Sequence, residues 1–240
     1  MKKTIGKIFA VAMAAVMTFS AAPALTAEAA TKTLATKTVY LESEYSTESI
    51  SIQADKATKI SNLKSTNKTV VKPSSYNINK STQVDEDGKD KSSSQYGYAY
   101  FTAVKPGTAT VSFKGGSTNY KQKVTVKKYV NPLKSLKINN NELVSMIKNS
   151  AYGAQASAAK TIKVNATAAS GWKINNISIY NSLDNGSADM YRYYSNGTSK
   201  GSLTFSGYNT KKYGSVSIRL ENKKDGGEIY VSVSLKSATK

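Results

Sequence analysis

Tyrosines at alternate positions give this sequence a candidate sugar-binding surface. In a β-strand, Tyr96, Tyr98 and Tyr100 lie on one face, because successive side chains point to opposite sides. Tyr191 and Tyr193 form a second group with the same spacing. Exposed rows of tyrosine stack against sugar rings at low entropic cost. Tyrosine is also common in strands without any ligand, because its ring partly covers the sheet. A sugar-binding role and a purely structural role therefore both stay open.

Lysines form a second regular pattern. Lys121, Lys123 and Lys127 share one face of a predicted strand whose other face carries Val124 and Val126. Such a basic stripe attracts a polyanion. The alternative is that the strand lies at the edge of its sheet, where lysines prevent edge-to-edge aggregation.

One acidic cluster interrupts this basic chain. Asp85, Asp87 and Asp90 surround Gly88, and a Ca²⁺ ion needs several oxygens on such a tight turn. The spacing differs from the EF-hand pattern, because Tyr96 stands at the twelfth position. The alternative is a solvated acidic loop, and no cofactor other than this Ca²⁺ ion is predicted.

The sequence of 240 residues contains no His and no Cys. The commonest general base, the usual catalytic metal ligand and every Ser-His or Cys-His pair are therefore missing. A glycosidase needs two placed carboxylates, one of them in apolar surroundings, whereas Asp and Glu here lie in polar, turn-like segments. We expect no catalytic residue and a protein that is not an enzyme. A hydrolase with an unfamiliar Ser-Lys or carboxylate site is the remaining alternative.

The formal net charge is +19, from 34 basic and 15 acidic residues. Arg192 and Arg219 are the only arginines, and arginine is the residue suited to reading bases, so nucleic acid is not expected as a partner. A lysine-dominated exported protein instead suits attraction to polyanions such as teichoic acids or anionic glycans. The alternative is that the charge serves solubility alone.

Residues 1–29 have the pattern of a secretory signal peptide. Lys2 and Lys3 precede an apolar run from Ile8 to Phe19, and Ala27-Glu28-Ala29 offers a cleavage site with small residues. The apolar run is short for a membrane-spanning helix. We expect a secreted, extracellular protein that does not span the membrane after cleavage and that is either free or associated with the cell wall.

Residues 30–130 predict a first β-domain of about seven short strands, which suggests a sandwich. A strand that ends at Ala103 is expected to turn at Pro106-Gly107 and to form a hairpin with the next strand. In that next strand Ala109, Val111 and Phe113 point inward. Residues 74–95 are rich in Ser, Asn, Lys and Asp and predict a long polar loop.

The motifs of this first domain resemble a known family. Ser65-Thr66-Asn67, Val70-Val71, the run Val-Lys-Pro-Gly-Thr-Ala-Thr-Val at 104–111 and Val124-Thr125-Val126 follow the order seen in the bacterial immunoglobulin-like domain of group 2. The resemblance covers about residues 33–128. It implies an immunoglobulin-like sandwich and a place among exported surface proteins of bacteria, such as adhesins and cell-wall proteins. It supplies no catalytic residues, and fold transfers better than function.

Residues 131–240 predict a second β-sandwich domain after a linker at Asn131-Pro132. One short helix is expected near 141–152, with a cap at Asn141 and an end at Gly153. The pair Asn175-Asn176 is expected to shift the register between two strand patterns. Asp225-Gly226 predicts a tight hairpin, because glycine adopts positive φ without strain. The predicted fold class is therefore all-β, with two immunoglobulin-like sandwiches in tandem.

These observations predict an exported bacterial surface or cell-wall-associated protein, with a binding or structural role and without catalysis. Its expected partner is a cell-wall polyanion or a glycan. The alternative is an accessory module, in which the first domain is a spacer and the second domain binds a surface protein.

Overall fold

Nearly all of the chain that the structure describes is β-strand. The computed structural model describes residues 30–54, 59–84, 90–182 and 188–236, and the side chains of 54, 80–94 and 188–196 are not described. The signal-peptide segment 1–29 and the acidic positions Asp85 and Asp87 lie outside these residues. The all-β fold class is confirmed.

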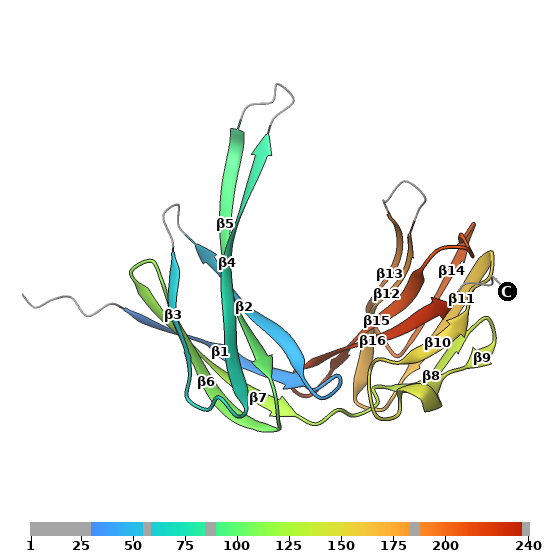
Figure 1. The fold of residues 1–240 in the computed structure, drawn as a ribbon, viewed down its shortest axis with the longest axis horizontal. Coiled ribbons are helices and arrows are strands. Elements are labelled where there is room, and N and C mark those ends of the chain that lie inside the picture. Colours follow the sequence, from blue (N-terminus) through green and yellow to red (C-terminus); the bar gives the residue numbers. More distant parts are fainter. Residues whose placement is uncertain (1–29, 55–58, 85–89, 183–187, 237–240) are drawn as a thin grey trace, which may run out of the picture.

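The described part of the N-terminal lobe contains seven strands, in agreement with the sequence pattern. They are β1 (Thr31–Tyr40), β2 (Ser46–Ala54), β3 (Ile60–Ser65), β4 (Val71–Val84), β5 (Asp90–Ala103), β6 (Gly107–Gly115) and β7 (Thr118–Lys127). One sheet has the order β2-β5-β4, and the facing strands have the order β1-β7-β6-β3. This is the immunoglobulin plan, in which the second, fourth and fifth strands face the third, sixth and seventh. Figure 1 shows the two layers at the N-terminal side of the molecule.

The core of this lobe follows from the alternation of its strands. Ala109, Val111 and Phe113 are buried, as predicted, and Phe101 of the opposite sheet has no exposed surface. The buried residues of the lobe form one hydrophobic cluster that extends from Val39 to Val126. Apolar burial on this scale is the main source of stability for a sandwich without disulfides.

The predicted hairpin at Pro106-Gly107 is wrong. Strands β5 and β6 belong to different sheets, so the chain crosses from one layer of the sandwich to the other at this turn. Gly107 passes so close to Val70 that a Cβ on it would lie 2.8 Å from the valine Cγ2 atom. A turn signal marks where a strand ends, but it does not say which strand pairs with the next one.

The predicted polar loop at 74–95 is also wrong. Strands β4 and β5 pair in antiparallel fashion from Val71 opposite Ala103 to Val84 opposite Asp90. Figure 1 shows that these two strands rise as an arm beyond the body of the lobe. Ser, Asn and Lys are common in loops, but strands that project beyond the body of the lobe cover little core and therefore need few apolar residues.

The edge-strand interpretation of Lys121, Lys123 and Lys127 is contradicted. Their strand, β7, lies between β1 and β6. Strand β1 pairs with β7 in parallel, from Thr31 opposite Asn119 to Tyr40 opposite Lys127. Strand β1 is far from β7 in the sequence, so no short turn joins the two strands and no local signal predicts that they pair.

The C-terminal lobe repeats the sandwich with different strand lengths. Its strands are β8 (Leu133–Ile138), β9 (Asn141–Glu142), β10 (Ala154–Ser157), β11 (Thr161–Ala168), β12 (Trp172–Ser182), β13 (Ala188–Thr198), β14 (Lys200–Ser206), β15 (Gly214–Asn222) and β16 (Glu228–Lys236). The order β14-β11-β8-β9 faces the order β13-β12-β15-β16, with β10 beside β16. Its buried residues form a second hydrophobic cluster.

The helix predicted at 141–152 shrinks to one 3₁₀ turn, Val144–Ile147, with no side-chain cap. Asn139 and Asn140 both have positive φ, which produces a tight turn and returns the chain as the short strand β9. The Glu142 carboxylate then accepts hydrogen bonds from the backbone N–H groups of Leu136 and Val144. Asn141 is therefore a strand residue and not a helix cap.

Two local predictions in this lobe are confirmed. Strands β15 and β16 form the hairpin expected at Asp225-Gly226, and Gly226 has φ of 67°. The pairing of β12 with both β13 and β15 shifts between Ile174 and Asn176, which is the register change expected at the Asn-Asn pair.

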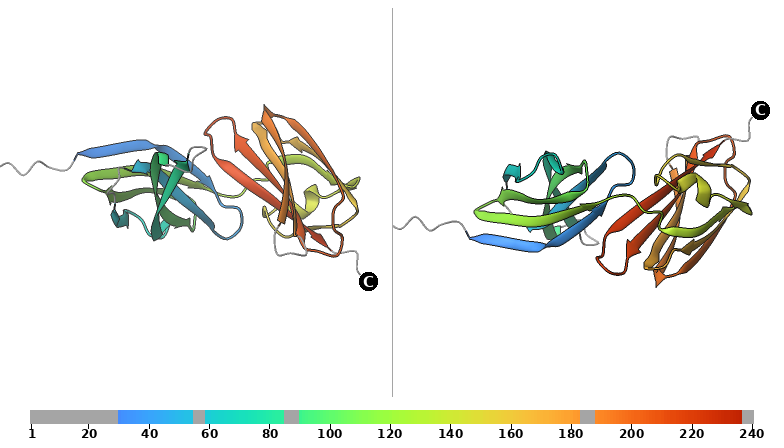
Figure 2. Two further views of the ribbon diagram at one scale, coloured as in Figure 1. Left: turned by 90° about the horizontal axis from the view of Figure 1, so that it is seen from above. Right: turned by 90° about the horizontal axis from the view of Figure 1, so that it is seen from below.

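One strand pairing joins the two lobes. Val39 of β1 pairs in parallel with Glu228 of β16, so a single sheet of nine strands runs through both sandwiches. The views in Figure 2 show the lobes side by side, with the segment after β7 passing between them. The ring of Tyr40 packs edge-on against Trp172 of the other lobe, with centroids 5.1 Å apart.

Glu42, in the turn after β1, provides the densest contact between the lobes. Its carbonyl oxygen accepts hydrogen bonds from the Ala151 N–H at 2.8 Å and from Ser150 Oγ at 3.1 Å. Its carboxylate accepts hydrogen bonds from Tyr152 Oη and, at 2.7 Å, from the Tyr230 N–H. Burial raises the pKa of the Glu42 carboxyl, although these two hydrogen bonds oppose the shift.

The two clusters predict two separable unfolding events. Phe101→Ala should destabilise the N-terminal lobe by about 3–5 kcal/mol, because it removes a large buried side chain. Ile177→Ala is the matched change in the other cluster. If the sandwiches are independent domains, calorimetry will show that each variant lowers a different transition. A single transition that both variants shift equally would contradict the two-domain organisation.

Glu42 predicts a pH dependence. Its raised pKa means that the folded state holds the proton more tightly, so stability is highest below the ordinary glutamate value of about 4.3 and falls as pH rises above it. Glu42→Gln should remove this fall. Glu42→Ala should cost about 1–2 kcal/mol, because the Tyr230 N–H loses its acceptor. Urea unfolding from pH 4 to pH 7 measures both effects, and an unchanged pH slope in the glutamine variant would refute the assignment.

Candidate functional site

The outward side of strands β1, β7, β6 and β3 forms one continuous surface, which we call the lysine face. Residues that pair across strands share a face of the sheet. Lys64, Ser112, Lys121 and Thr33 therefore form one row across the four strands. Lys114 and Lys123 lie in the rows on either side. The face thus presents four lysines, each on the solvent side of a strand whose other side packs into the core.

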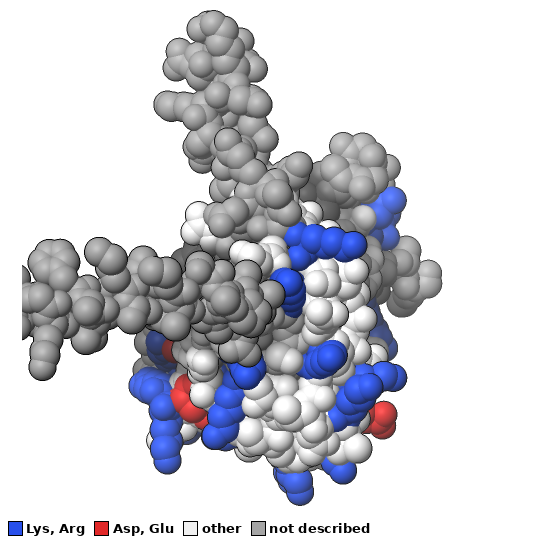
Figure 3. Space-filling model, turned by 90° about the vertical axis from the view of Figure 1, so that its left-hand side faces the viewer, with Lys and Arg blue, Asp and Glu red and all other residues white. Residues whose placement is uncertain are grey.

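Hydroxyl groups fill most of the space between these lysines. Thr108, Thr110, Ser112 and Thr125 alternate with the buried residues of β6 and β7 and so point outward. Strands β1, β3, β6 and β7 contain no Asp or Glu. None of the four lysines takes part in an ion pair within the described residues. Their charge is therefore not neutralised by carboxylates of the same sheet. Figure 3, which views the molecule from the end of the N-terminal lobe, shows more basic than acidic side chains among the residues that it colours.

The structure separates Lys127 from the other two lysines that the sequence pattern joined. Lys127 Nζ lies 2.6 Å from Asp225 Oδ2 and 5.6 Å from the centre of the Tyr40 ring. Tyr40 Oη donates a hydrogen bond to the same Asp225 oxygen, at 3.0 Å. Lys127 is thus part of the contact between the lobes, and its charge is paired with that of Asp225, whereas its use by a ligand stays a prediction.

Sequence reasoning missed Lys64 and Lys114. Lys114 continues the alternation of Thr108, Thr110 and Ser112, so the pattern of β6 contained the signal. Lys64 follows a bulge between Ser61 and Lys64 that changes the parity of β3. Its position on this face could not be read from a strict alternation.

The first tyrosine group lies on the other outer face of the same sandwich. Tyr96, Tyr98 and Tyr100 alternate along β5 with the buried Ala99 and Phe101. Tyr96 is 40% exposed, and the rings of Tyr98 and Tyr100 lie nearly parallel with centroids 6.2 Å apart. The predicted common face of these tyrosines is therefore present, whereas their use by a ligand stays a prediction.

The remaining predicted site residues are not described in detail. Tyr191 and Tyr193 lie in β13 opposite Ile179 and Ile177, but their side chains are outside the described part. Asp90 begins β5, and Asp85 and Asp87 are outside the described residues altogether. Within the described residues, no group of three or more acidic side chains gathers that could hold a metal ion. The Ca²⁺ hypothesis therefore stays a prediction.

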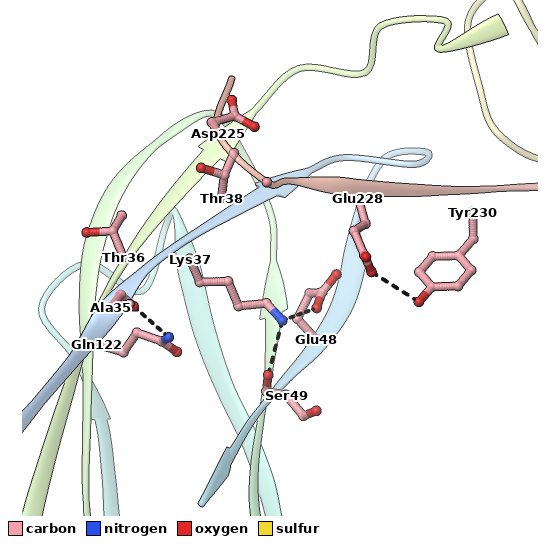
Figure 4. Close-up of a pocket in the computed structure, with 11 residues that line it drawn as sticks. Ala35, Thr36, Lys37, Thr38, Glu48, Ser49, Gln122, Asp225, Glu228 and Tyr230 are labelled. Carbon is pink, nitrogen blue, oxygen red and sulfur yellow. Dashed lines mark hydrogen bonds and ion pairs between the residues drawn. The ribbon is translucent and has the colours of Figure 1, made fainter. Parts of the chain in front are cut away.

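A cleft of about 510 Å³ lies where the lobes meet. Figure 4 shows polar side chains that line it: Lys37, Glu48, Ser49, Gln122, Asp225, Glu228 and Tyr230. Lys37 binds Glu48 at 2.8 Å, and Arg219 binds Glu228 at 2.6 Å. Asp225 is held by Lys127, as described above. Because these charged groups satisfy one another, the cleft offers little electrostatic attraction to an ionic ligand.

Comparisons with known proteins were made for the whole chain. No protein-family model matches it, and no curated protein matches it. Among solved structures it is similar to the Yersinia pseudotuberculosis adhesin InvE, at 10% identity and a TM-score of 0.23, over 82% of this chain and 56% of that one. It is also similar to domains 4–9 of the surface layer protein SbsC, at 15% identity and a TM-score of 0.28, over 86% of this chain and 31% of that one.

The chain thus spans just over half of the adhesin and about a third of the SbsC fragment. These similarities are too weak to carry an argument, so the immunoglobulin-like fold rests on the strand order described above. The resemblance to the bacterial immunoglobulin-like domain of group 2 stays a prediction. No helix in the described part has the length and apolar character that a membrane crossing requires.

Asp225 predicts a second pH effect, of opposite sign to that of Glu42. Burial alone would raise the pKa of Asp225, but hydrogen bonds from Lys127, the Gly227 N–H and Tyr40 outweigh it and lower the pKa. Its stabilisation is therefore present above the ordinary aspartate value of about 3.9 and is lost as pH falls through the lower folded value. Asp225→Asn should cost about 1–2 kcal/mol at pH 7 and progressively less below pH 4. Urea unfolding checks this, and an equal cost at both pH values would contradict it.

Proposed function

We propose that this chain is an exported bacterial surface or cell-wall-associated protein that binds an anionic wall polymer through the lysine face, without catalysis. The observation that carries the proposal is the arrangement of Lys64, Lys114, Lys121 and Lys123. They lie on the adjoining strands β3, β6 and β7, and neither these three strands nor the neighbouring β1 contains a carboxylate. Export is the expectation from the sequence of residues 1–29.

The geometry of the face suits a polymer better than a small anion. Neighbouring strands are about 4.8 Å apart and alternate residues along a strand about 7 Å apart, so the four charges are spread over several strands and rows. An extended chain with repeated phosphate or carboxylate groups can contact several of them at once, and the hydroxyl groups between them can donate hydrogen bonds to its oxygens.

The chemistry of lysine also fits this ligand class. Lysine is a compact point charge on a flexible stem, which tolerates variable positions of the partner charge, whereas arginine favours a fixed bidentate geometry. A wall polymer presents the same charged unit many times and requires no reading of a sequence. Binding of this kind is weak for each contact and is strongly screened by salt.

The finer architecture is part of the proposal. We place residues 30–130 and 131–240 as tandem domains, the first of the bacterial immunoglobulin-like group 2. The run Val-Lys-Pro-Gly-Thr-Ala-Thr-Val at 104–111 supports this family assignment. It forms the turn between the two sheets and the start of β6, a central strand of the lysine face. The contact between the lobes then presents the lysine face at a constant angle to the second sandwich.

The test is retention of the mature chain on purified wall teichoic acid. Replacing Lys64, Lys114, Lys121 and Lys123 with Gln should abolish most of the retention at 50 mM salt. For the unmodified chain, binding should fall on the order of tenfold or more between 50 and 200 mM salt, by analogy with other polyanions.

The matched control replaces four exposed lysines of the C-terminal lobe, Lys134, Lys148, Lys163 and Lys236, with Gln and gives the same net charge. This control should keep most of the retention. Equal losses in both variants would show that net charge, and not the lysine face, attracts the polymer. No retention of the unmodified chain at either salt concentration would favour a partner protein instead.

A further inference from the structure

The sheet β2-β5-β4 has an outer face that the polyanion proposal does not use. Tyr96, Tyr98 and Tyr100 form a line along its central strand, and we call this surface the tyrosine face. At about 3.4 Å per residue, the three alternate positions extend over about 14 Å. Gly97 lies beneath this line, where a Cβ would come within 2.7 Å of Ile60 Cδ1. The strand that carries the tyrosines is therefore held close against the opposite sheet.

Polar side chains border the tyrosines on both sides. On β4, Asn79 pairs with Tyr96 and Asn77 with Tyr98. On β2, Gln53 and Ser51 pair with the same two tyrosines. Asn77, Asn79, Ser51 and Gln53 are all exposed, and the Asn77 amide N–H donates to Asn79 Oδ1 at 3.0 Å. The face thus combines flat rings with amides and hydroxyls that both donate and accept hydrogen bonds.

Charge distinguishes this surface from the lysine face. Among the described outward positions of the three strands, Lys72 is the only charged one, and it lies opposite Thr102, beyond the end of the tyrosine line. A polyanion has little to bind here, and a basic peptide has no carboxylate to meet. The complementary ligand is uncharged, with apolar ring faces that stack on tyrosine and with hydroxyl groups at its edges.

We propose that the tyrosine face binds an extended, uncharged β-1,4-linked glycan. Such a chain adopts a flat ribbon, whose sugar rings can lie over successive tyrosines while their hydroxyl or N-acetyl groups reach Asn79 and Gln53. The length of the tyrosine line is several times the width of one sugar ring, so the site suits a chain and not a monosaccharide. The N-terminal sandwich then binds different wall components on its two outer faces, and this site goes beyond the polyanion function.

The test is retention of the mature chain on insoluble chitin and on cellulose in 1 M NaCl, where attraction between exposed charges is screened. The unmodified chain should be retained on at least one of the two solids. The double variant Tyr96→Ala and Tyr98→Ala should lose about tenfold or more in affinity, and Tyr98→Trp should keep it, because stacking requires the ring. Replacing Asn79 and Gln53 with Ala changes exposed side chains only and should weaken retention several-fold. This variant tests the site even if the tyrosine double variant does not fold.

Two controls isolate the site. Tyr45→Ala removes a tyrosine of the same lobe that is 59% exposed but lies in the turn after β1, and it should leave retention unchanged. The four-lysine variant should also be retained normally, so failure of the polyanion proposal does not affect this test. The proposal is overturned if the unmodified chain is retained on neither solid, or if the tyrosine variants are retained as well as the Tyr45 control. The proposal is also overturned if sedimentation shows that the tyrosine variants lose retention only because their oligomeric state has changed.

Discussion

The contact between β1 and β16 determines how the whole molecule is built. Val39 and Glu228 join the sheets of the two sandwiches, and Glu42 adds four hydrogen bonds from one residue of the adjoining turn. A partly buried carboxylate is costly unless it is hydrogen-bonded, so Glu42 stabilises the contact only while its donors, Tyr152 Oη and the Tyr230 N–H, stay in place. The relative position of the lobes therefore depends on a small number of specific polar contacts in addition to the packing of Tyr40 on Trp172.

This contact also decides which charges remain available. Asp225 sits in the β15–β16 hairpin and reaches across to Lys127, so the docking of the lobes pairs the charge of this lysine with a carboxylate. Near this contact, Lys37 is paired with Glu48 and Glu228 with Arg219, each within its own lobe. Within the described residues, no ion pair joins the lysines farther along β7 and β6 to a carboxylate. The charge of the lysine face thus follows from where the acidic residues are, as much as from where the lysines are.

The immunoglobulin plan explains how one small lobe can offer two chemically different surfaces. Each sheet buries one side against Phe101, Val111 and their neighbours, which leaves the two opposite sides free of packing constraints. One of these sides carries Lys and Thr, and the other carries Tyr and Asn. Because the core separates them, a ligand on one face does not compete directly with a ligand on the other.

The sequence by itself determined what depends on neighbours along the chain. Alternation predicted the inward Ala109, Val111 and Phe113, the common face of the tyrosines, the Asp225-Gly226 hairpin and the bulge after Ile174, because side-chain direction and turn conformation are local properties. The tertiary structure alone decided which strands pair. It separated β5 from β6 at Pro106-Gly107, placed β1 beside β7, turned residues 74–95 into a hairpin arm, and moved Lys127 from a binding stripe to Asp225. These outcomes depend on contacts between residues far apart in sequence, and no local pattern encodes a partner that lies 98 residues away, as Asp225 does from Lys127.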